Sequence, residues 1–188
     1  MKFDYLIVGS GLAGLMLCET LRKRGKSFKV VSNTSQQASV VASGLYNPVV
    51  LKRFNKAWNA DTQLPLALST YKDLEIFLGI KVDHQLPIYR VFHAVDEQNN
   101  WFLACDKPDL QPFLIPKVIN NDNTNINAPY GYGEVRQTGR VDTKLLLESY
   151  VFSLKSKGLY LEETFNYKAL DLQMGVNYKL SLIHISEP

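Results

Sequence analysis

The sequence has few cysteines and no long hydrophobic segment. Its 188 residues include only two cysteines, Cys18 and Cys105, which lie far apart in the chain. This spacing excludes a disulfide framework and a cysteine-based zinc site, and it agrees with a reducing, cytoplasmic environment. The longest apolar run is about five residues, whereas a membrane-spanning helix needs about 18. The N-terminus lacks the long apolar stretch of a signal peptide, so we expect a cytoplasmic protein.

The chain also lacks a strong charge of either sign. There are 21 basic and 18 acidic residues, and the net charge of +3 gives no reason to expect nucleic-acid binding. Hydrophobic residues make up 46% of the chain, which is typical of a folded globular protein. His84 and His93 have no carboxylate or cysteine at ligand spacing, so we expect no metal site.

The first part of the chain has the pattern of a strand, a helix and a second strand. Residues 3–8 are an apolar run, as expected for a strand that is buried on both faces. A helix is predicted over 15–24, with its buried stripe formed by Gly14, Leu17, Cys18 and Leu21, and a second strand over 28–31. This order predicts a βαβ unit, and therefore an α/β fold with a Rossmann-like parallel sheet.

Further elements follow along the rest of the chain. Trp58 belongs either to a hydrophobic core, which is the default expectation, or to the wall of a cleft. Asp142 is a good N-cap for a helix that ends at Gly158. A helix is predicted over 61–78, a short helix or turn over 97–105, and an exposed loop over 120–127. Strands are predicted over 87–95, 133–137 and 159–161, and a hairpin from strands over 167–172 and 177–182.

The turn after the first strand is rich in glycine. Gly9 allows a tight exit from the strand, Gly11 lets a pyrophosphate approach the backbone, and Gly14 lets the helix pack closely on the sheet. The free amides at the start of the helix point at the phosphates, and the helix dipole favours the negative charge. This pattern predicts dinucleotide binding by the turn residues Gly9, Ser10, Gly11, Leu12, Ala13 and Gly14.

An acidic residue is missing where such sites usually bind ribose. The end of the second strand carries Ser32, followed by Asn33, and we predict that these two residues contact the ribose more weakly than a carboxylate would. Loss of the carboxylate would also remove repulsion of a 2′-phosphate, but no arginine follows closely to bind one.

Three segments together resemble a known family. They are residues 4–14 with the glycine-rich turn, the small-residue stretch 38–48, and residues 138–154, where Gly139 and Asp142 precede a helix. In this order they resemble the FAD-dependent oxidoreductases of the D-amino-acid oxidase/glycine oxidase (DAO) superfamily, and in particular a bacterial branch with the motif Gly-Leu-Tyr-Asn-Pro.

The resemblance implies FAD as the cofactor and a total length near twice that of this chain. It implies an FAD-binding Rossmann-like domain over 1–85 and 134–180, and the first part of an α+β antiparallel substrate domain over 86–133. The final residues, 181–188, resemble a non-native tail, and the alternative is a genuine strand and tail. With the implied length, this favours a truncated N-terminal fragment without activity of its own. The implied reaction is hydride transfer from an amine or amino acid to the flavin, with no nucleic-acid partner.

Several other residues are candidates for contacts to the cofactor or the substrate. Ser43 and Gly44 either contact the pyrophosphate or flavin, or simply form a tight turn. Asn47 either bonds the flavin or caps a turn before Pro48. Lys52 and Arg53 either stabilise the reduced flavin and attract a carboxylate, or belong to a solvated basic loop. The sequence identifies no catalytic residue.

Other functions remain open at this point. The same fold would suit a tRNA-modifying flavoenzyme or a dinucleotide-binding module without turnover. An NAD(P)-dependent dehydrogenase is disfavoured, because a polar loop and a small-residue stretch follow the second strand where a simple Rossmann enzyme continues βαβ. Neither the substrate nor the oligomeric state can be read from these patterns.

Overall fold

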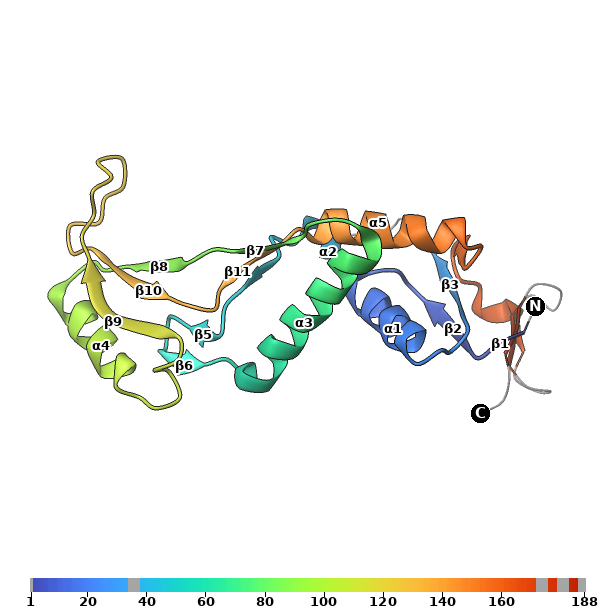
Figure 1. The fold of residues 1–188 in the computed structure, drawn as a ribbon, viewed down its shortest axis with the longest axis horizontal. Helices are drawn as coiled ribbons and strands as arrows, with labels where there is room; N and C mark the ends of the chain where they lie inside the picture. Colours follow the sequence, from blue (N-terminus) through green and yellow to red (C-terminus); the bar gives the residue numbers. More distant parts are fainter. Residues whose placement is uncertain (1, 34–37, 172–175, 179–182, 186–188) are drawn as a thin grey trace. The chain divides into compact units, whose positions relative to one another are not determined.

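The computed structural model describes residues 2–33, 38–171, 176–178 and 183–185 (Figure 1). The chain divides into two compact units, which are described separately. Unit 1 comprises Met1–Ala42 and Asp142–Pro188, and unit 2 comprises Ser43–Val141.

Unit 1 contains the predicted βαβ arrangement. Strands β2 (Tyr5–Val8), β3 (Phe28–Ser32) and β12 (Tyr160–Glu162) form a parallel sheet in the order β12-β3-β2, and α1 (Leu12–Lys23) connects β2 to β3. Val30 and Val31 of the central strand are fully buried. The α/β fold with a Rossmann-like parallel sheet is therefore confirmed.

Burial of the first strand and helix differs in detail from the prediction. Tyr5 and Val8 are 44% and 51% exposed, so β2 is not buried on both faces by the described residues, among which it pairs with β3. Leu17 is 47% exposed. The buried face of α1 is centred on Leu15 and Cys18, which places Leu17 roughly 120° around the helix. The buried face of α1 is therefore rotated about the helix axis relative to the predicted stripe, although Cys18 and Leu21 belong to both.

The rest of unit 1 comprises two helices and a second sheet. Helix α5 (Thr143–Ser156) begins at the predicted cap, where Asp142 Oδ1 accepts a hydrogen bond from the Leu145 amide at 3.0 Å. The second sheet has the order β1-β15-β14-β13, and β13 pairs with β14 as the predicted hairpin requires. The remaining elements are α2 (Ala38–Val41), η1 (Tyr167–Ala169), β1 (Lys2–Phe3), β13 (Leu170–Asp171), β14 (Val176–Tyr178) and β15 (Ile183–Ile185).

The predicted tail 181–188 lies only partly within the described residues. Ile183–Ile185 form β15, which pairs with β1 and β14. Residues 181–182 and 186–188 lie outside the described residues. That the tail is non-native stays a prediction.

Unit 2 is built from antiparallel strand pairs and two helices. Its sheets have the orders β8-β10-β9, β4-β11-β7 and β5-β6. The helices α3 (Ala60–Leu78) and α4 (Val95–Cys105) confirm the predictions for 61–78 and 97–105. The strands are β4 (Leu45–Tyr46), β5 (Val49–Val50), β6 (Asn55–Lys56), β7 (Asp83–Gln85), β8 (Ile88–Val91), β9 (Leu114–Ile119), β10 (Tyr132–Val135) and β11 (Gly139–Val141).

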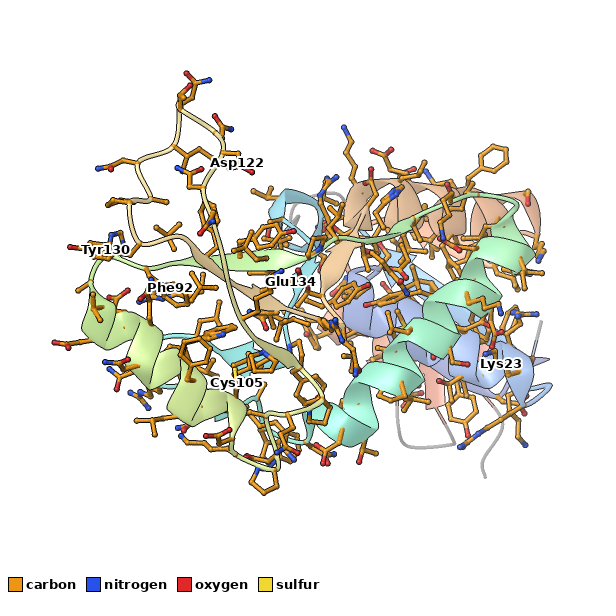
Figure 2. All side chains as sticks on the ribbon, turned by 60° about the vertical axis from the view of Figure 1, so that its left-hand side comes forward. Lys23, Phe92, Cys105, Asp122, Tyr130 and Glu134 are labelled. Atoms are coloured by element: carbon orange, nitrogen blue, oxygen red, sulfur yellow. The ribbon has the colours of Figure 1, made fainter. Side chains whose placement is uncertain are left out.

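The core of unit 2 lies between α4 and the sheet β8-β10-β9 (Figure 1). Trp101 is fully buried there, and its indole packs edge-on against Phe92 at 5.7 Å between ring centroids. Phe92 and Cys105, both labelled in Figure 2, belong to the same core. Trp58, expected in a core, is 83% exposed, because it lies in the connection between β6 and α3. The loop that carries Asp122 is exposed as predicted (Figure 2).

The compact units differ from the predicted domain bounds. Residues 43–85 and 134–141 belong to unit 2 together with 86–133. Strand β11 causes this grouping, because it pairs with β4 on one side and β7 on the other and so joins these segments to each other. The assignment of a cofactor domain to 1–85 and 134–180, and of a substrate domain to 86–133, stays a prediction about function.

Candidate functional site

The glycine-rich turn joins β2 to α1 and lets the start of the helix pack closely against the end of the strand. Gly9 has φ of 97°, a conformation that side chains rarely tolerate, and its amide donates to the carbonyl of Val31 at 2.9 Å. A Cβ atom at Gly14 would collide with the carbonyl oxygen of Gly9. The turn therefore needs both glycines to bring the start of the helix against the end of the strand. This agrees with the packing roles predicted for them.

The start of α1 offers hydrogen-bond donors to an anion. Gly11 is the N-cap residue, and no side chain caps the helix there. The Leu12 amide donates to Ser39 Oγ at 3.3 Å, while the amides of Ala13 and Gly14 have no hydrogen-bond partner among the described residues. The first turn of α1, all of which the structure describes, contains no acidic residue. Unpaired amides and the positive end of the helix dipole suit a phosphate group.

A cavity of about 350 Å³ opens beside this turn, entirely within unit 1. It extends from the start of α1 to the ends of β3 and β12, which is where open α/β sheets bind ligands. One wall is formed by α5. The lining residues are Ser10, Gly11, Asn33, Ser39, Val40, Lys144, Leu147, Glu148, Val151, Lys155, Tyr160 and Glu162.

Ser32 and Asn33, predicted to contact ribose, take different positions. Ser32 is 9% exposed; its hydroxyl accepts from Ser10 Oγ at 3.0 Å and donates to the Asn33 carbonyl at 3.2 Å. Asn33 lines the cavity, and its side-chain nitrogen donates to Thr164 Oγ1 at 2.9 Å. The structure thus brings Ser10, Gly11 and Asn33 to the cavity, whereas Ser32 lies behind them and bonds to its neighbours.

Sequence reasoning missed the wall that β12 contributes. Lys155 Nζ contacts Glu162 Oε2 at 2.6 Å and lies 5.3 Å from the centre of the Tyr160 ring. The hydrogen bond to Glu162 raises the pKa of Lys155. The Tyr160 hydroxyl lies 3.3 Å from Ser10 Oγ. A signal was available for Tyr160, which lies in the strand predicted over 159–161, but the place of that strand beside β3 depends on long-range pairing.

The remaining predicted residues lie in unit 2. The Ser43 carbonyl accepts from Arg140 Nε at 3.1 Å, and the carbonyl of Gly44 accepts from the Val141 amide at 3.0 Å. Asn47 Oδ1 accepts from the Val49 amide at 2.9 Å, which is the turn-capping alternative. Lys52 and Arg53 are exposed in the turn between β5 and β6. Their contacts to cofactor or substrate stay predictions.

Both cysteines are buried thiols. Burial raises the pKa of Cys18 to about 12 and that of Cys105 to about 11, so neither is a reactive thiolate at neutral pH. In the part of the chain that the structure describes, no group of three or more metal-ligating side chains occurs. Nor does any helix among those residues have the length and apolar character required to cross a bilayer.

Comparisons with known proteins place the turn in a family context. Residues 4–63 match the family described as FAD binding domain. Glycine oxidase from Bacillus cereus ATCC 14579 is similar in structure, with a TM-score of 0.63 and 21% identity over 93% of this chain and 51% of that one. The chain therefore shares the fold of this glycine oxidase over that length.

Two further solved structures share this fold. L-amino acid deaminase from Proteus myxofaciens matches with a TM-score of 0.67 and 13% identity, over 99% of this chain and 44% of that one. Iminodiacetate oxidase from Chelativorans sp. BNC1 matches with a TM-score of 0.62 and 12% identity, over 85% of this chain and 47% of that one. The chain spans about half the length of the structures it matches.

The glycine-rich turn fits FAD. The unpaired amides of Ala13 and Gly14 suit the pyrophosphate, and Gly11 leaves the approach to the backbone open, with Ser39 Oγ 3.5 Å from where its Cβ would be. The cavity beyond the turn lies where the adenosine part of a dinucleotide binds in such sheets.

Proposed function

We propose that the protein oxidises an amine or amino acid by hydride transfer to bound FAD. The observation that carries this proposal is the turn from Gly9 to Gly14, where two unpaired amides meet an open cavity inside a DAO-type fold. Since the chain covers about half the length of its structural relatives, this activity is proposed for the whole protein and not for the chain alone.

The residues of unit 1 bind and orient the cofactor in this proposal. The backbone amides of Ala13 and Gly14 donate hydrogen bonds to the pyrophosphate. Ser10 and Asn33 face the adenosine from the cavity wall. The bound flavin supplies the redox chemistry, by accepting a hydride from the carbon that bears the amine.

The residues of unit 2 have a different proposed task. Lys52 and Arg53 are exposed cations in one short turn, and they would stabilise negative charge on the flavin edge or on a substrate carboxylate. Gly44 has φ of 71° and, with Ser43, forms a tight turn that would present backbone groups to the cofactor. A small amine or amino acid as substrate and a cytoplasmic location, suggested by two buried free thiols, belong to the same proposal.

Reduction of the bound flavin by candidate substrates tests this function. The purified flavoprotein is mixed without oxygen with a panel of amines and amino acids, and the flavin absorbance near 450 nm is followed. Bleaching by an amine or amino acid, reversed by oxygen, is the expected result. Bound flavin that no panel member bleaches would contradict the proposal and favour a dinucleotide-binding module. Bleaching only by an aminomethyl nucleoside in tRNA would favour a tRNA-modifying flavoenzyme.

A further inference from the structure

We infer that Glu162, at the end of β12, is the carboxylate that accepts the ribose hydroxyls of the FAD adenosine in this chain. Sites of this type usually bind the ribose with an acidic residue at the end of the second strand, and in this chain Glu162 supplies that carboxylate from a neighbouring strand. The inference rests on the proposed binding of FAD and names the residue responsible for one part of it.

Ser32, which stands at the usual ribose-binding position, already forms hydrogen bonds within the protein. Ser32 stands at the end of β3, accepts a hydrogen bond from Ser10 and donates its own proton to the Asn33 carbonyl. Ser32 is 9% exposed and does not line the cavity. A ribose in the cavity therefore needs another acceptor, because a ribose hydroxyl that gives up water on binding keeps a hydrogen bond only where the protein supplies one.

Glu162 lies at the matching position one strand away. In the parallel pairing of β12 with β3, Glu162 is the register partner of Ser32, so both residues end their strands at the same edge of the sheet. Unlike Ser32, Glu162 lines the cavity together with Ser10, Gly11 and Asn33. The carboxylate that is missing at the end of β3 is therefore present at the same level of the sheet on β12.

The state of the Glu162 side chain suits this role. Oε2 is held by Lys155 Nζ at 2.6 Å, whereas Oε1 has no hydrogen-bond partner among the described residues. Lys155 also lies over the Tyr160 ring, which fixes the ammonium group at the cavity wall. An ionised carboxylate with one occupied oxygen retains ample capacity to accept from two hydroxyls. Lys155 is therefore a positioning residue for Glu162.

Titration of FAD and of two adenine nucleotides tests this assignment. Wild type, Glu162→Gln and Glu148→Gln are compared by calorimetry, with FAD, ADP and 2′-deoxy-ADP as ligands. Glu148 is a matched control without an assigned role: it lines the same cavity from α5 and pairs with a lysine, and it has a similar side-chain exposure of 62% against 54%. Far-UV circular dichroism establishes that both variants are folded.

We expect Glu162→Gln to weaken FAD binding about tenfold and to abolish the preference of the wild type for ADP over 2′-deoxy-ADP. Glu148→Gln should stay within about twofold of wild type. A folded Glu162→Gln protein that binds FAD as wild type does, or that keeps the preference for ADP, would overturn the inference while FAD binding stands. Equal losses in both variants would also overturn it, because they would reflect the charge of the cavity alone. A wild type that binds neither FAD nor ADP would contradict the proposed function itself.

Discussion

Gly14 in unit 1 and Gly133 in unit 2 make the same kind of room for different purposes. A Cβ atom at Gly14 would collide with the backbone carbonyl of Gly9, and one at Gly133 would collide with the indole ring of Trp101. In unit 1 the close approach brings unpaired backbone amides to the edge of a cavity. In unit 2 it lets a large aromatic side chain fill the core. The missing side chain therefore serves ligand binding in one unit and packing in the other.

The polar groups of the two units differ in the same way. The cavity of unit 1 is lined by hydroxyl, amide, ammonium and carboxylate groups that several elements bring together. In unit 2 the Trp101 indole nitrogen donates to the Ile115 carbonyl at 2.8 Å, so its polar atom is used inside the core. The amides of Ala13 and Gly14 in unit 1 have no hydrogen-bond partner among the described residues and can bind a ligand, whereas the indole nitrogen of Trp101 stabilises the fold.

Truncation of Trp101 is expected to have the largest effect on stability. Trp101→Ala leaves a large cavity between α4 and the sheet and should lower the free energy of unfolding by about 4 kcal/mol. Urea unfolding followed by circular dichroism measures this change. The matched control is Trp58→Ala, whose side chain is 83% exposed and should change stability by less than about 0.5 kcal/mol. Similar losses in the two variants would contradict the core described for unit 2.

A side chain at Gly14 should have the next largest effect. Gly14→Val forces α1 away from Gly9 and should lower the free energy of unfolding by about 3 kcal/mol. The same displacement should abolish FAD binding. Thermal unfolding and FAD titration test both parts. Ala13→Val, at the neighbouring exposed position, should cost only about 0.5 kcal/mol in stability. The close packing of α1 on β2 would be disproved if Gly14→Val were as stable as Ala13→Val.

A smaller effect is expected at the buried carboxylate of α1. Glu19 is 1% exposed, and Arg22 contacts both of its oxygens, at 2.7 and 2.8 Å. Arg22→Ala removes these hydrogen bonds and should lower the free energy of unfolding by about 1.5 kcal/mol. Lys23→Ala should cost less than about 0.5 kcal/mol, because Lys23 Nζ lies 3.8 Å from the carboxylate and is 41% exposed. Urea titrations of the two variants give the comparison, and a larger loss for Lys23→Ala would refute it.

The sequence predicted those features that depend on neighbouring residues. The glycine spacing and the apolar run before it indicate the βαβ unit, and Asp142 marks the start of α5. These signals are local, because turn geometry and helix capping involve residues a few positions apart. The fold class and the location of the candidate phosphate site could therefore be derived without coordinates.

Features that depend on distant pairing could not be predicted. The exposure of Tyr5 and Val8 depends on how the rest of the chain packs on β2, which the local apolar pattern does not encode. The place of Glu162 beside Ser32 needs two strands to pair although these residues are 130 positions apart in the chain. The segment that carries Ser43, Gly44 and Asn47 joins unit 2 because β11 pairs with β4, a contact that no local pattern encodes.

FAD titration of wild type and Gly11→Val tests the central claim, which is that backbone groups of the glycine-rich turn hold the cofactor. Gly11 has an ordinary φ of −71°, and its Cβ would meet Ser39 Oγ at 3.5 Å, so the variant should fold, with only the small loss of stability expected for Val at an N-cap. Its side chain would stand where the pyrophosphate approaches the backbone. The account predicts that wild type binds FAD and that the folded Gly11→Val protein binds it at least about 100-fold more weakly. Equal FAD affinity in the two folded proteins would show that the turn is not the binding site.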